Sequence, residues 1–305
     1  MEKICFSPGL ILMSYIQNLK KSSTHILLKI MNILLEQEIT STYKDSRTKE
    51  KNISRVMKII DSRGWDKLNK ELLREIAYLV GKVTGDGNLD KSFTVRLIGQ
   101  KEDVHDIMAL INEKLEVPLE KMSIRYKQWL NGTSYVLQIN DSTLGRLLYI
   151  FGAPLGNKTF NNFLVPNWIY HSNDNEVKRR YLQALLEDEL STIKIEKSSY
   201  SNKPFFKMAK NEDKKENLTL FLKQVKDIIE EFDIECSNVS IPKIENIKKS
   251  GKNTIYAYFC INRNKSNIIK FKENLGFRIN KKKIEKLNKT YDILSKSKSK
   301  SRLPH

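Results

Sequence analysis

The sequence predicts an α+β fold in which two pseudo-symmetric αββαββα units follow a small helical extension. Apolar residues at helical spacing give way to short segments of period two, in the order helix–strand–strand–helix–strand–strand–helix. The same order begins again about a hundred residues later, which indicates an internal duplication. We therefore expect an extension over residues 1–70, a first unit over 71–170, a second over 171–294 and a basic, disordered tail over 295–305.

The elements of the first unit follow from the spacing of its apolar residues. A helical stripe over residues 76–83 runs into the sequence Gly85-Asp86-Gly87. Alternation then predicts a half-buried strand, and a second helix follows over 104–115. Asn131-Gly132 lies between two further alternating segments and is a strong signal for a tight hairpin turn. A helix near 144–151 closes the unit.

The second unit repeats this order with different residues. Its first helix, which carries Tyr181, Leu182, Leu185 and Leu186, ends in Glu187-Asp188-Glu189. The remaining elements are expected as strands near 192–196 and 205–209, a helix over 218–232, a strand over 254–261, and helices over 266–275 and 282–294.

The extension carries helical spacing and no strand signal. One apolar stripe covers residues 26–34, and a polar break runs from Thr40 to Asn52. A second short helix begins at Ile53 and is ended by Gly64. Two interpretations agree with this pattern: a small helical DNA-binding appendage, for which helix-turn-helix is one candidate form, and an extension that only packs against the first unit.

The charge balance favours a polyanionic partner. The 305 residues include 54 Lys and Arg against 36 Asp and Glu, a formal net charge of +18. A chain this basic repels itself unless a polyanion or counterions neutralise it, so nucleic acid is the leading partner and an acidic membrane surface its competitor. No apolar run reaches the ~18 residues that a membrane span needs, so we expect no membrane partner.

Cysteine, histidine and the first residues indicate the compartment. Three cysteines without CxxC spacing are typical of a reduced compartment and of a protein without structural zinc. Four scattered histidines argue against a His-rich metal site. Met1-Glu2-Lys3 leads into no secretion signal. We therefore expect an intracellular protein, whether cytoplasmic, nucleoid-associated or organellar.

Two helices, one in each unit, end in a carboxylate after a run of apolar and small residues. Gly81 and Gly85 are four residues apart, as are Ala184 and Asp188, and small residues at this spacing let two helices approach closely. Such packing would bring Asp86 and Glu189 together, where their charges repel unless a divalent cation lies between them. Hard oxygen ligands suit Mg²⁺. Each segment alone also fits an ordinary helix end that leads into a turn, but its repetition favours a shared site.

These residues resemble a known family. Leu79–Gly87, read as LVGKVTGDG, resembles the LAGLIDADG motif of homing endonucleases, and Leu182–Leu190 looks like a second, weaker copy. The segment 152–158, followed by 165–169, is similar to the connection between the halves of single-chain, archaeal-type members. Residues 270–277, with the lysines that follow, are similar to the end of the second half. The resemblance covers roughly residues 71–294.

The resemblance implies a fold and an activity. The motif helices would pack at a pseudo-twofold axis, and two antiparallel sheets would form a saddle in the major groove of double-stranded DNA. The protein would be a monomer that cleaves both strands at a long, specific site. Asp86 and Glu189 would bind Mg²⁺ or Mn²⁺, which activates water and stabilises the leaving oxygen at each scissile phosphate.

The resemblance also implies supporting residues. Gln100 and Lys101 are candidates to position water, with Lys210 at the comparable place in the second unit. Lys158 and one of Lys281 or Lys282, of which we choose Lys281, are candidates to stabilise the charge of the transition state. Alternation along the strands places side chains opposite the apolar face, where they can read DNA or simply face water. These DNA-facing candidates are Thr94, Arg96, Arg125, Lys127 and Lys207.

The second motif departs from the pattern and leaves other functions open. Ala184 and Leu190 replace glycines, and Asp188 stands where a small residue normally packs. These changes favour a nickase, or a DNA binder without cleavage, as alternatives. An RNA maturase that assists intron splicing and a DNA-binding regulator are further alternatives, but neither needs Asp86 and Glu189. Self-splicing is not expected, because the chain starts with Met1-Glu2 and lacks a terminal His-Asn pair.

Overall fold

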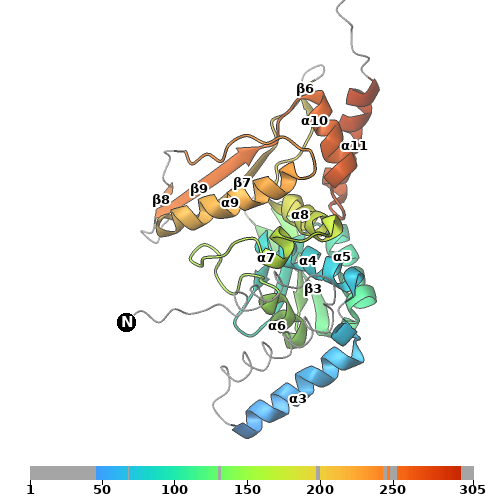
Figure 1. Ribbon diagram of the computed structural model, residues 1–305. Helices are drawn as coiled ribbons and strands as arrows, with labels where there is room; N and C mark the ends of the chain where they lie inside the picture. Colours follow the sequence, from blue (N-terminus) through green and yellow to red (C-terminus); the bar gives the residue numbers. More distant parts are fainter. Residues whose placement is uncertain are drawn as a thin grey trace, which may run out of the picture. The chain divides into compact units, whose positions relative to one another are not determined.

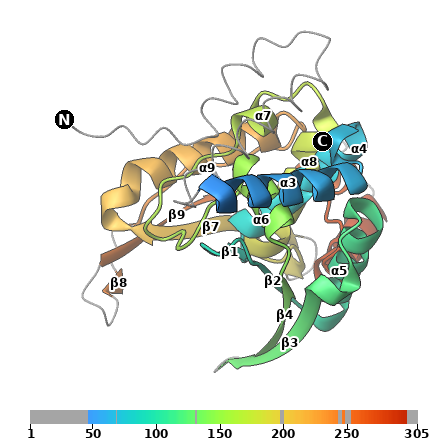
Figure 2. The same ribbon diagram turned by 90° about the horizontal axis from the view of Figure 1, so that it is seen from below.

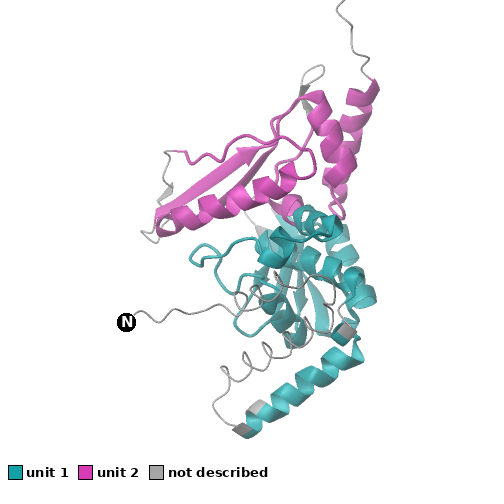
Figure 3. Ribbon diagram, viewed as in Figure 1, with its two compact units in different colours: residues 1–184 teal, residues 185–305 magenta. Residues whose placement is uncertain are grey.

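The chain folds into two compact units, residues 1–184 and 185–305 (Figure 3). The computed structural model describes residues 46–67, 69–129, 132–196, 200–242, 246–247 and 253–296. The expected helix over 26–34 and most of the basic tail lie outside these residues. The division between the units falls inside one helix, α8 (Asn175–Glu189). Both units combine helices with antiparallel sheet, so the predicted α+β class is confirmed (Figure 1).

The first unit has the predicted αββαββα order. Its elements are α4 (Lys70–Thr84), β1 (Asn88–Leu89), β2 (Val95–Gly99), α5 (Lys101–Leu115), β3 (Met122–Trp129), β4 (Gly132–Ile139) and α6 (Ser142–Ile150). The strands form one antiparallel sheet in the order β1-β2-β4-β3. β3 and β4 pair as far as Trp129 and Gly132, which confirms the tight hairpin. Figure 2 shows this curved hairpin extending past α5.

Alternation along the sheet separates a buried face from a polar one. Val95 and Leu97 of β2 are fully buried, as are Leu137 and Ile139 of β4. α4 and α5 supply the other side of this core through residues such as Val83, Val104, Ile107 and Ile111, all at most 1% exposed. Burying each such side chain contributes roughly 1.5–3 kcal/mol, so this face fixes the register of the strands.

The extension packs on the first unit through α3 (Ser46–Ser62) and a 3₁₀ turn at Trp65–Lys67. Val56 and Ile60 are buried, and the Trp65 indole donates a hydrogen bond of 3.1 Å to the carbonyl of Leu115. The predicted polar break to Asn52 is wrong from Ser46 onward, because α3 begins there. Its first residues are polar, but charged side chains on the solvent side of a helix cost little. α3 lies alongside α6 (Figure 2).

The second unit begins with the last residues of α8. Leu190 then forms an antiparallel bridge to Phe206 of β7 (Phe205–Asn211). The elements that follow are α9 (Lys215–Glu230), β8 (Asn246–Ile247), β9 (Asn253–Cys260), α10 (Lys265–Lys270) with a π-helical turn at Phe271–Leu275, and α11 (Lys281–Lys296). The sheet order is β7-β9-β8. With Leu190 at its edge, this sheet repeats the order of the first unit.

One insertion separates the two patterns. β5 (Ile195–Glu196) and β6 (Tyr200–Ser201) form a two-stranded hairpin of their own between Leu190 and β7. The strand predicted over 192–196 is therefore reduced to β5, which pairs only with β6. Leu190 takes the place of β1 in this unit. Its bridge to Phe206 of β7 lies at the edge of the sheet, where β1 pairs with β2 in the first unit.

Candidate functional site

The first motif lies at the carboxyl end of α4. The Asn69 side chain caps the start of this helix by accepting a hydrogen bond of 2.8 Å from the N–H of Leu72. The helix ends at Thr84, and the Gly85 N–H still bonds to the carbonyl of Gly81 at 2.9 Å. Asp86 follows and is exposed. The motif therefore presents its last carboxylate to solvent at the end of a buried helix.

Within the first unit, α4 and the first part of α8 are in close contact at Gly81. A Cβ atom at Gly81 would lie 2.5 Å from the Tyr181 carbonyl oxygen and 2.8 Å from the Ala184 Cβ. Both distances are shorter than any real contact, so only glycine fits there. Arg74 of α4 also pairs with Asp174, just before α8, at 3.0 Å. The expected close approach of two helices through small residues is thus confirmed at Gly81 and Ala184.

The two motif acids hold equal positions relative to this contact. Asp86 is five residues beyond Gly81, and Glu189 is five residues beyond Ala184. Glu189 is the last residue of α8 and is half-buried. Among the described residues, no three His, Cys, Asp or Glu side chains gather closely enough to hold a metal ion by themselves. A Mg²⁺ site needs fewer, because this ion usually takes one or two carboxylates, several waters and substrate phosphate. Each of the two motif carboxylates is a hard oxygen donor of the kind that suits Mg²⁺.

Lys158 closes the end of the first motif helix. Its ammonium group donates hydrogen bonds to the carbonyls of Val83 (3.0 Å), Thr84 (3.2 Å) and Gly87 (2.7 Å), and also to that of Gly85. These carbonyls have no partner within the helix and carry the negative end of its dipole. A lysine at this position therefore holds the backbone on both sides of Asp86.

Lys283 closes the second motif helix in the same way. It donates to the carbonyls of Leu186 (3.1 Å), Glu187 (2.6 Å) and Leu190 (2.5 Å). Val83 and Leu186 each lie three residues before the motif acid, and Gly87 and Leu190 each lie one residue after it. The counterpart of Lys158 is thus Lys283, two residues beyond the expected Lys281, which is exposed at the first position of α11.

Glu187 adds a second support in the second unit. This carboxylate is 2% exposed, and it accepts hydrogen bonds from the N–H groups of Arg278 (2.6 Å), Ile279 (2.5 Å) and Asn280 (3.3 Å). The acceptor thereby fixes the turn that leads into α11 and carries Lys283. The sequence alone did not indicate these roles for Glu187 and Lys283. The signal that could have shown Glu187 is a glutamate directly after the apolar pair Leu185-Leu186.

The other expected catalytic residues have different surroundings. Gln100 and Lys101 are exposed where β2 leads into α5. Lys210 is only 1% exposed, and its ammonium donates to the Asn217 side chain of α9. Burial, reinforced by the charge of Lys214, lowers the pKa of Lys210 to about 7. Lys210 therefore lies on the covered side of β7, away from the exposed side that carries Lys207.

The expected DNA-facing residues of the first unit share one face. The register pairs Arg96 with Gln138, Arg125 with Val136 and Lys127 with Ser134. Because directly paired residues point the same way, these side chains lie opposite the buried Val95 and Leu97. Thr94 precedes β2 with the same alternation. The structure thus places these side chains on one face of the sheet, and their contact with DNA stays a prediction.

Two contacts modify the charge of these faces. Arg96 forms an ion pair of 2.8 Å with Asp90. Burial works to raise the pKa of Asp90, but hydrogen bonds from Ser92, Arg96 and two backbone N–H groups outweigh it and lower that pKa. In the second unit, the Lys207 ammonium lies 3.8 Å from the centre of the Tyr256 ring. The two faces thus differ: the first carries Arg96 paired with Asp90 besides Arg125 and Lys127, and the second carries Lys207 over an aromatic ring.

Comparisons with known proteins add the following. No family model matches the chain. It is 29% identical over 204 residues to a replication factor C small subunit of Methanocaldococcus jannaschii, covering 61% of this chain and 10% of that protein. It is 30% identical over 195 residues to the DNA-directed RNA polymerase subunit Rpo1N of the same organism, covering 59% and 14%. It is 27% identical over 227 residues to a tRNA-splicing ligase RtcB of Methanopyrus kandleri, covering 70% and 22%.

The chain thus spans between 10% and 22% of the length of these curated relatives. Their three names describe three different activities, so none of these activities carries over to the matched segment. Among solved structures, mesophilic variants of the homing endonuclease I-DmoI match with a TM-score of 0.42 at 14% identity, covering 69% of this chain and 100% of that one. The homing endonuclease I-WcaI bound to its DNA recognition sequence matches with a TM-score of 0.39 at 14% identity, covering 72% and 86%. Similarity at this level transfers no function.

None of the helices that the structure describes is long and apolar enough to cross a bilayer.

Proposed function

We propose that this chain is a metal-dependent, site-specific endonuclease of double-stranded DNA, related to the LAGLIDADG homing endonucleases. The observation that carries the proposal is the duplicated motif end. Each motif helix has a carboxylate five residues beyond the Gly81–Ala184 contact, and each is closed by a lysine on equivalent carbonyls. A purely structural helix end has no need of a carboxylate at the same position in both units.

The acids suit a hydrolytic metal site. Asp86 and Glu189 would hold Mg²⁺ or Mn²⁺, and the ion would supply an activated water and stabilise the leaving oxygen. Each unit contributes one of these carboxylates, as a nuclease that cuts both strands requires. Lys158 and Lys283 orient the backbone that carries the acids and offset the negative end of each helix.

The polar sheet faces suit DNA. Arg125 and Lys127 are exposed on the sheet of the first unit, and Lys207 is exposed on that of the second. A sheet face with such side chains can contact base edges and phosphates in a major groove, and the net charge of +18 favours the same partner. Gln100, Lys101 and Lys281 are exposed, so we assign them to water positioning and phosphate contact. We assign Lys210 to the support of β7, because it is buried against α9.

The test is cleavage of a plasmid pool by the full-length protein. Supercoiled plasmids that carry inserts from the source genome are incubated with Mg²⁺ or Mn²⁺, and the ends of the linear products are sequenced. We expect linear DNA with one defined end sequence. Asp86→Asn removes a metal ligand, so it should lower the cleavage rate by on the order of 10²-fold or more while DNA binding persists. Asp61→Asn, at an exposed position of α3, is the matched control.

Each other outcome has a defined meaning. Cutting at the wild-type rate by Asp86→Asn would remove this residue from the metal site. Nicked circles without linear product would identify a nickase, in line with the weaker second motif. DNA binding without any cleavage in either metal would favour the DNA-binding regulator, and tighter binding to structured intron RNA would favour the maturase.

A further inference from the structure

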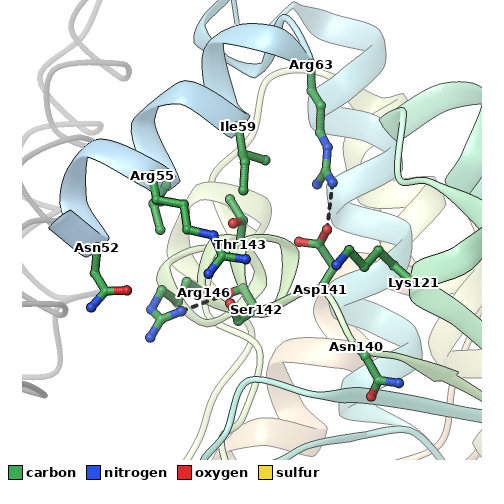
Figure 4. A pocket seen from close by; sticks show the side chains of 11 residues that line it. Asn52, Arg55, Ile59, Arg63, Lys121, Asn140, Asp141, Ser142, Thr143 and Arg146 are labelled. Carbon is green, nitrogen blue, oxygen red and sulfur yellow. Dashed lines mark hydrogen bonds and ion pairs between the residues drawn. The ribbon is translucent and has the colours of Figure 1, made fainter.

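A cavity of about 180 Å³ lies between the extension and the first unit. α3 forms one wall, and the start of α6 together with the adjoining ends of β3 and β4 forms the other (Figure 4). The polar side chains that matter here are Arg55, Arg63, Lys121, Asp141, Thr143 and Arg146. Neither the motif helices nor the sheet face described above contributes to this lining, so the cavity is separate from the proposed nuclease site.

The lining is strongly cationic. Three arginines and Lys121 face one carboxylate, that of Asp141. Asp141 already accepts two hydrogen bonds, one of 2.9 Å from the N–H of Leu144 as the cap of α6 and one of 2.6 Å from Arg63. The negative charge of Asp141 is therefore already paired with Arg63. Arg55, Arg146 and Lys121 remain as an excess of positive charge in the lining. Figure 4 shows Arg55, Arg63 and Arg146 reaching from different elements toward the same space.

Arg63 leaves part of its hydrogen-bonding capacity unused. Its side chain is 9% exposed, and its guanidinium stacks on the Trp65 ring at 4.8 Å. The Nη2 atom bonds to Asp141, but the buried Nη1 atom has no hydrogen-bond partner. A buried donor without a partner is costly, and a small rotation of the guanidinium toward the cavity that Arg63 lines would let a bound oxyanion satisfy it.

The start of α6 adds to the same preference. Ser142 and Thr143, the first two residues of this nine-residue helix, line the cavity. Backbone N–H groups at the start of a helix have no intrahelical partner and carry the positive end of the dipole. Such groups bind phosphate readily when cations stand beside them.

We propose that this cavity is a phosphate-binding site and that its physiological ligand is a phosphodiester group of the nucleic acid backbone. Arg55, Arg63 and Arg146 bind the phosphate oxygens, and the start of α6 completes the site. Because α3 supplies Arg55, the extension serves both as a packing element and as a second nucleic acid contact. The choice of nucleic acid over free phosphate rests on the proposed nuclease function; phosphate binding itself does not.

The first arm of the test measures inorganic phosphate. The full-length protein in chloride buffer is titrated with phosphate, followed by calorimetry and by the rise in Tm that a ligand of the native state produces. Arg55→Gln should weaken phosphate binding roughly tenfold, the loss of one charge-assisted hydrogen bond. Lys58→Gln, at an exposed position of the same helix outside the cavity, should leave it unchanged. Arg55 is itself exposed, so its substitution should leave the protein folded.

The second arm measures DNA. Duplex binding is followed against salt concentration in the Asp86→Asn background, which prevents cleavage. Adding Arg55→Gln should lower the slope of log affinity against log salt by about one, more than Lys58→Gln does. Phosphate binding without this change in slope would overturn the nucleic acid assignment and leave a site for free phosphate. Absence of phosphate binding to the wild-type protein would overturn the site. Because phosphate titration needs no cleavage, failure of the nuclease proposal is distinguishable from both results.

Discussion

The two motif ends reach the same arrangement by different contacts. In the first unit, the Gly87 N–H reaches back to the carbonyl of Lys82 at 2.9 Å, which crowds the backbone. A Cβ atom at Gly87 would lie 2.6 Å from that oxygen and 2.9 Å from the Val83 Cα. In the second unit, the Leu190 N–H bonds instead to Leu186 at 3.1 Å, as in a continuing α-helix.

This difference explains a departure that the sequence alone cast as a defect. Leu190 is 1% exposed and forms the bridge that starts the sheet of its unit. The α-helical hydrogen bond of Leu190 avoids the crowded turn seen at Gly87 and so leaves room for a side chain. Glu187 adds a further support in the second unit, because it holds the turn that leads into α11. The last residue of the motif must therefore be glycine where the backbone turns as it does at Gly87. It can be leucine where the helix continues, as at Leu190.

Placing at Gly87 the leucine that the second unit has at Leu190 should have the largest effect on stability. Gly87→Leu places a side chain against backbone that cannot move aside, so we expect the free energy of unfolding of the first unit to fall by about 3 kcal/mol or more. Trp65, Trp129 and Trp168 all lie in this unit, so urea unfolding followed by tryptophan fluorescence measures it. Gly99→Ala, whose Cβ would meet the Val104 side chain at 3.3 Å and the Asp103 Cβ at 3.7 Å, is the milder control. An unchanged urea midpoint for Gly87→Leu would contradict the distinction between the two ends.

Removing the two lysines should have the next largest effect. Lys158→Met and Lys283→Met each remove charge-assisted hydrogen bonds to the carbonyls around a motif acid, which should lower stability by about 1.5–3 kcal/mol. Both should also raise the Mg²⁺ concentration needed for half-maximal cleavage, and arginine at either position should restore part of it. Lys289→Met, at an exposed position further along α11, is the control. If it impaired metal dependence as strongly as Lys283→Met, the equivalence of Lys158 and Lys283 would be wrong.

A third effect concerns pH and the second unit alone. Lys210 has a lowered native pKa of about 7, whereas an unfolded lysine titrates near 10.4. Between these values the unfolded state binds more protons, so the free energy of unfolding should rise with pH through this window. Below pH 7 both states are protonated and the destabilisation is constant.

Urea unfolding followed by far-UV circular dichroism, after subtraction of the transition seen by tryptophan fluorescence, isolates this unit. Lys210→Met should flatten the pH dependence, whereas Lys207→Met, on the exposed side of the same strand, should retain it. An equal slope in the Lys210→Met protein would show that another group is responsible.

The sequence was most informative where local pattern and burial agree. The αββαββα order, the hairpin of β3 and β4, the shared face of Arg96 and Arg125, and the close contact at Gly81 follow from spacing alone. Periodicity selects the buried face, and the rest of a strand follows from it.

Contacts between distant parts of the chain were beyond that reasoning. The sequence does not distinguish Lys283 from Lys281, because neighbouring lysines differ only in the direction in which their side chains leave the first turn of α11. The structure shows that Lys283 contacts the motif carbonyls. The buried pairing of Arg63 with Asp141 joins residues 78 apart and leaves no periodic trace. The start of α3 at Ser46 was missed because exposed polar residues show no apolar stripe, although they form helices well.

The closing lysines come from different elements in the two units. Lys158 comes from the segment after α6 in the first unit, and Lys283 comes from the first turn of α11 in the second. Among the described residues, each motif helix end is therefore completed by a lysine of its own unit. A single unit thus carries in its own sequence both the acid-bearing helix end and the cation that closes it.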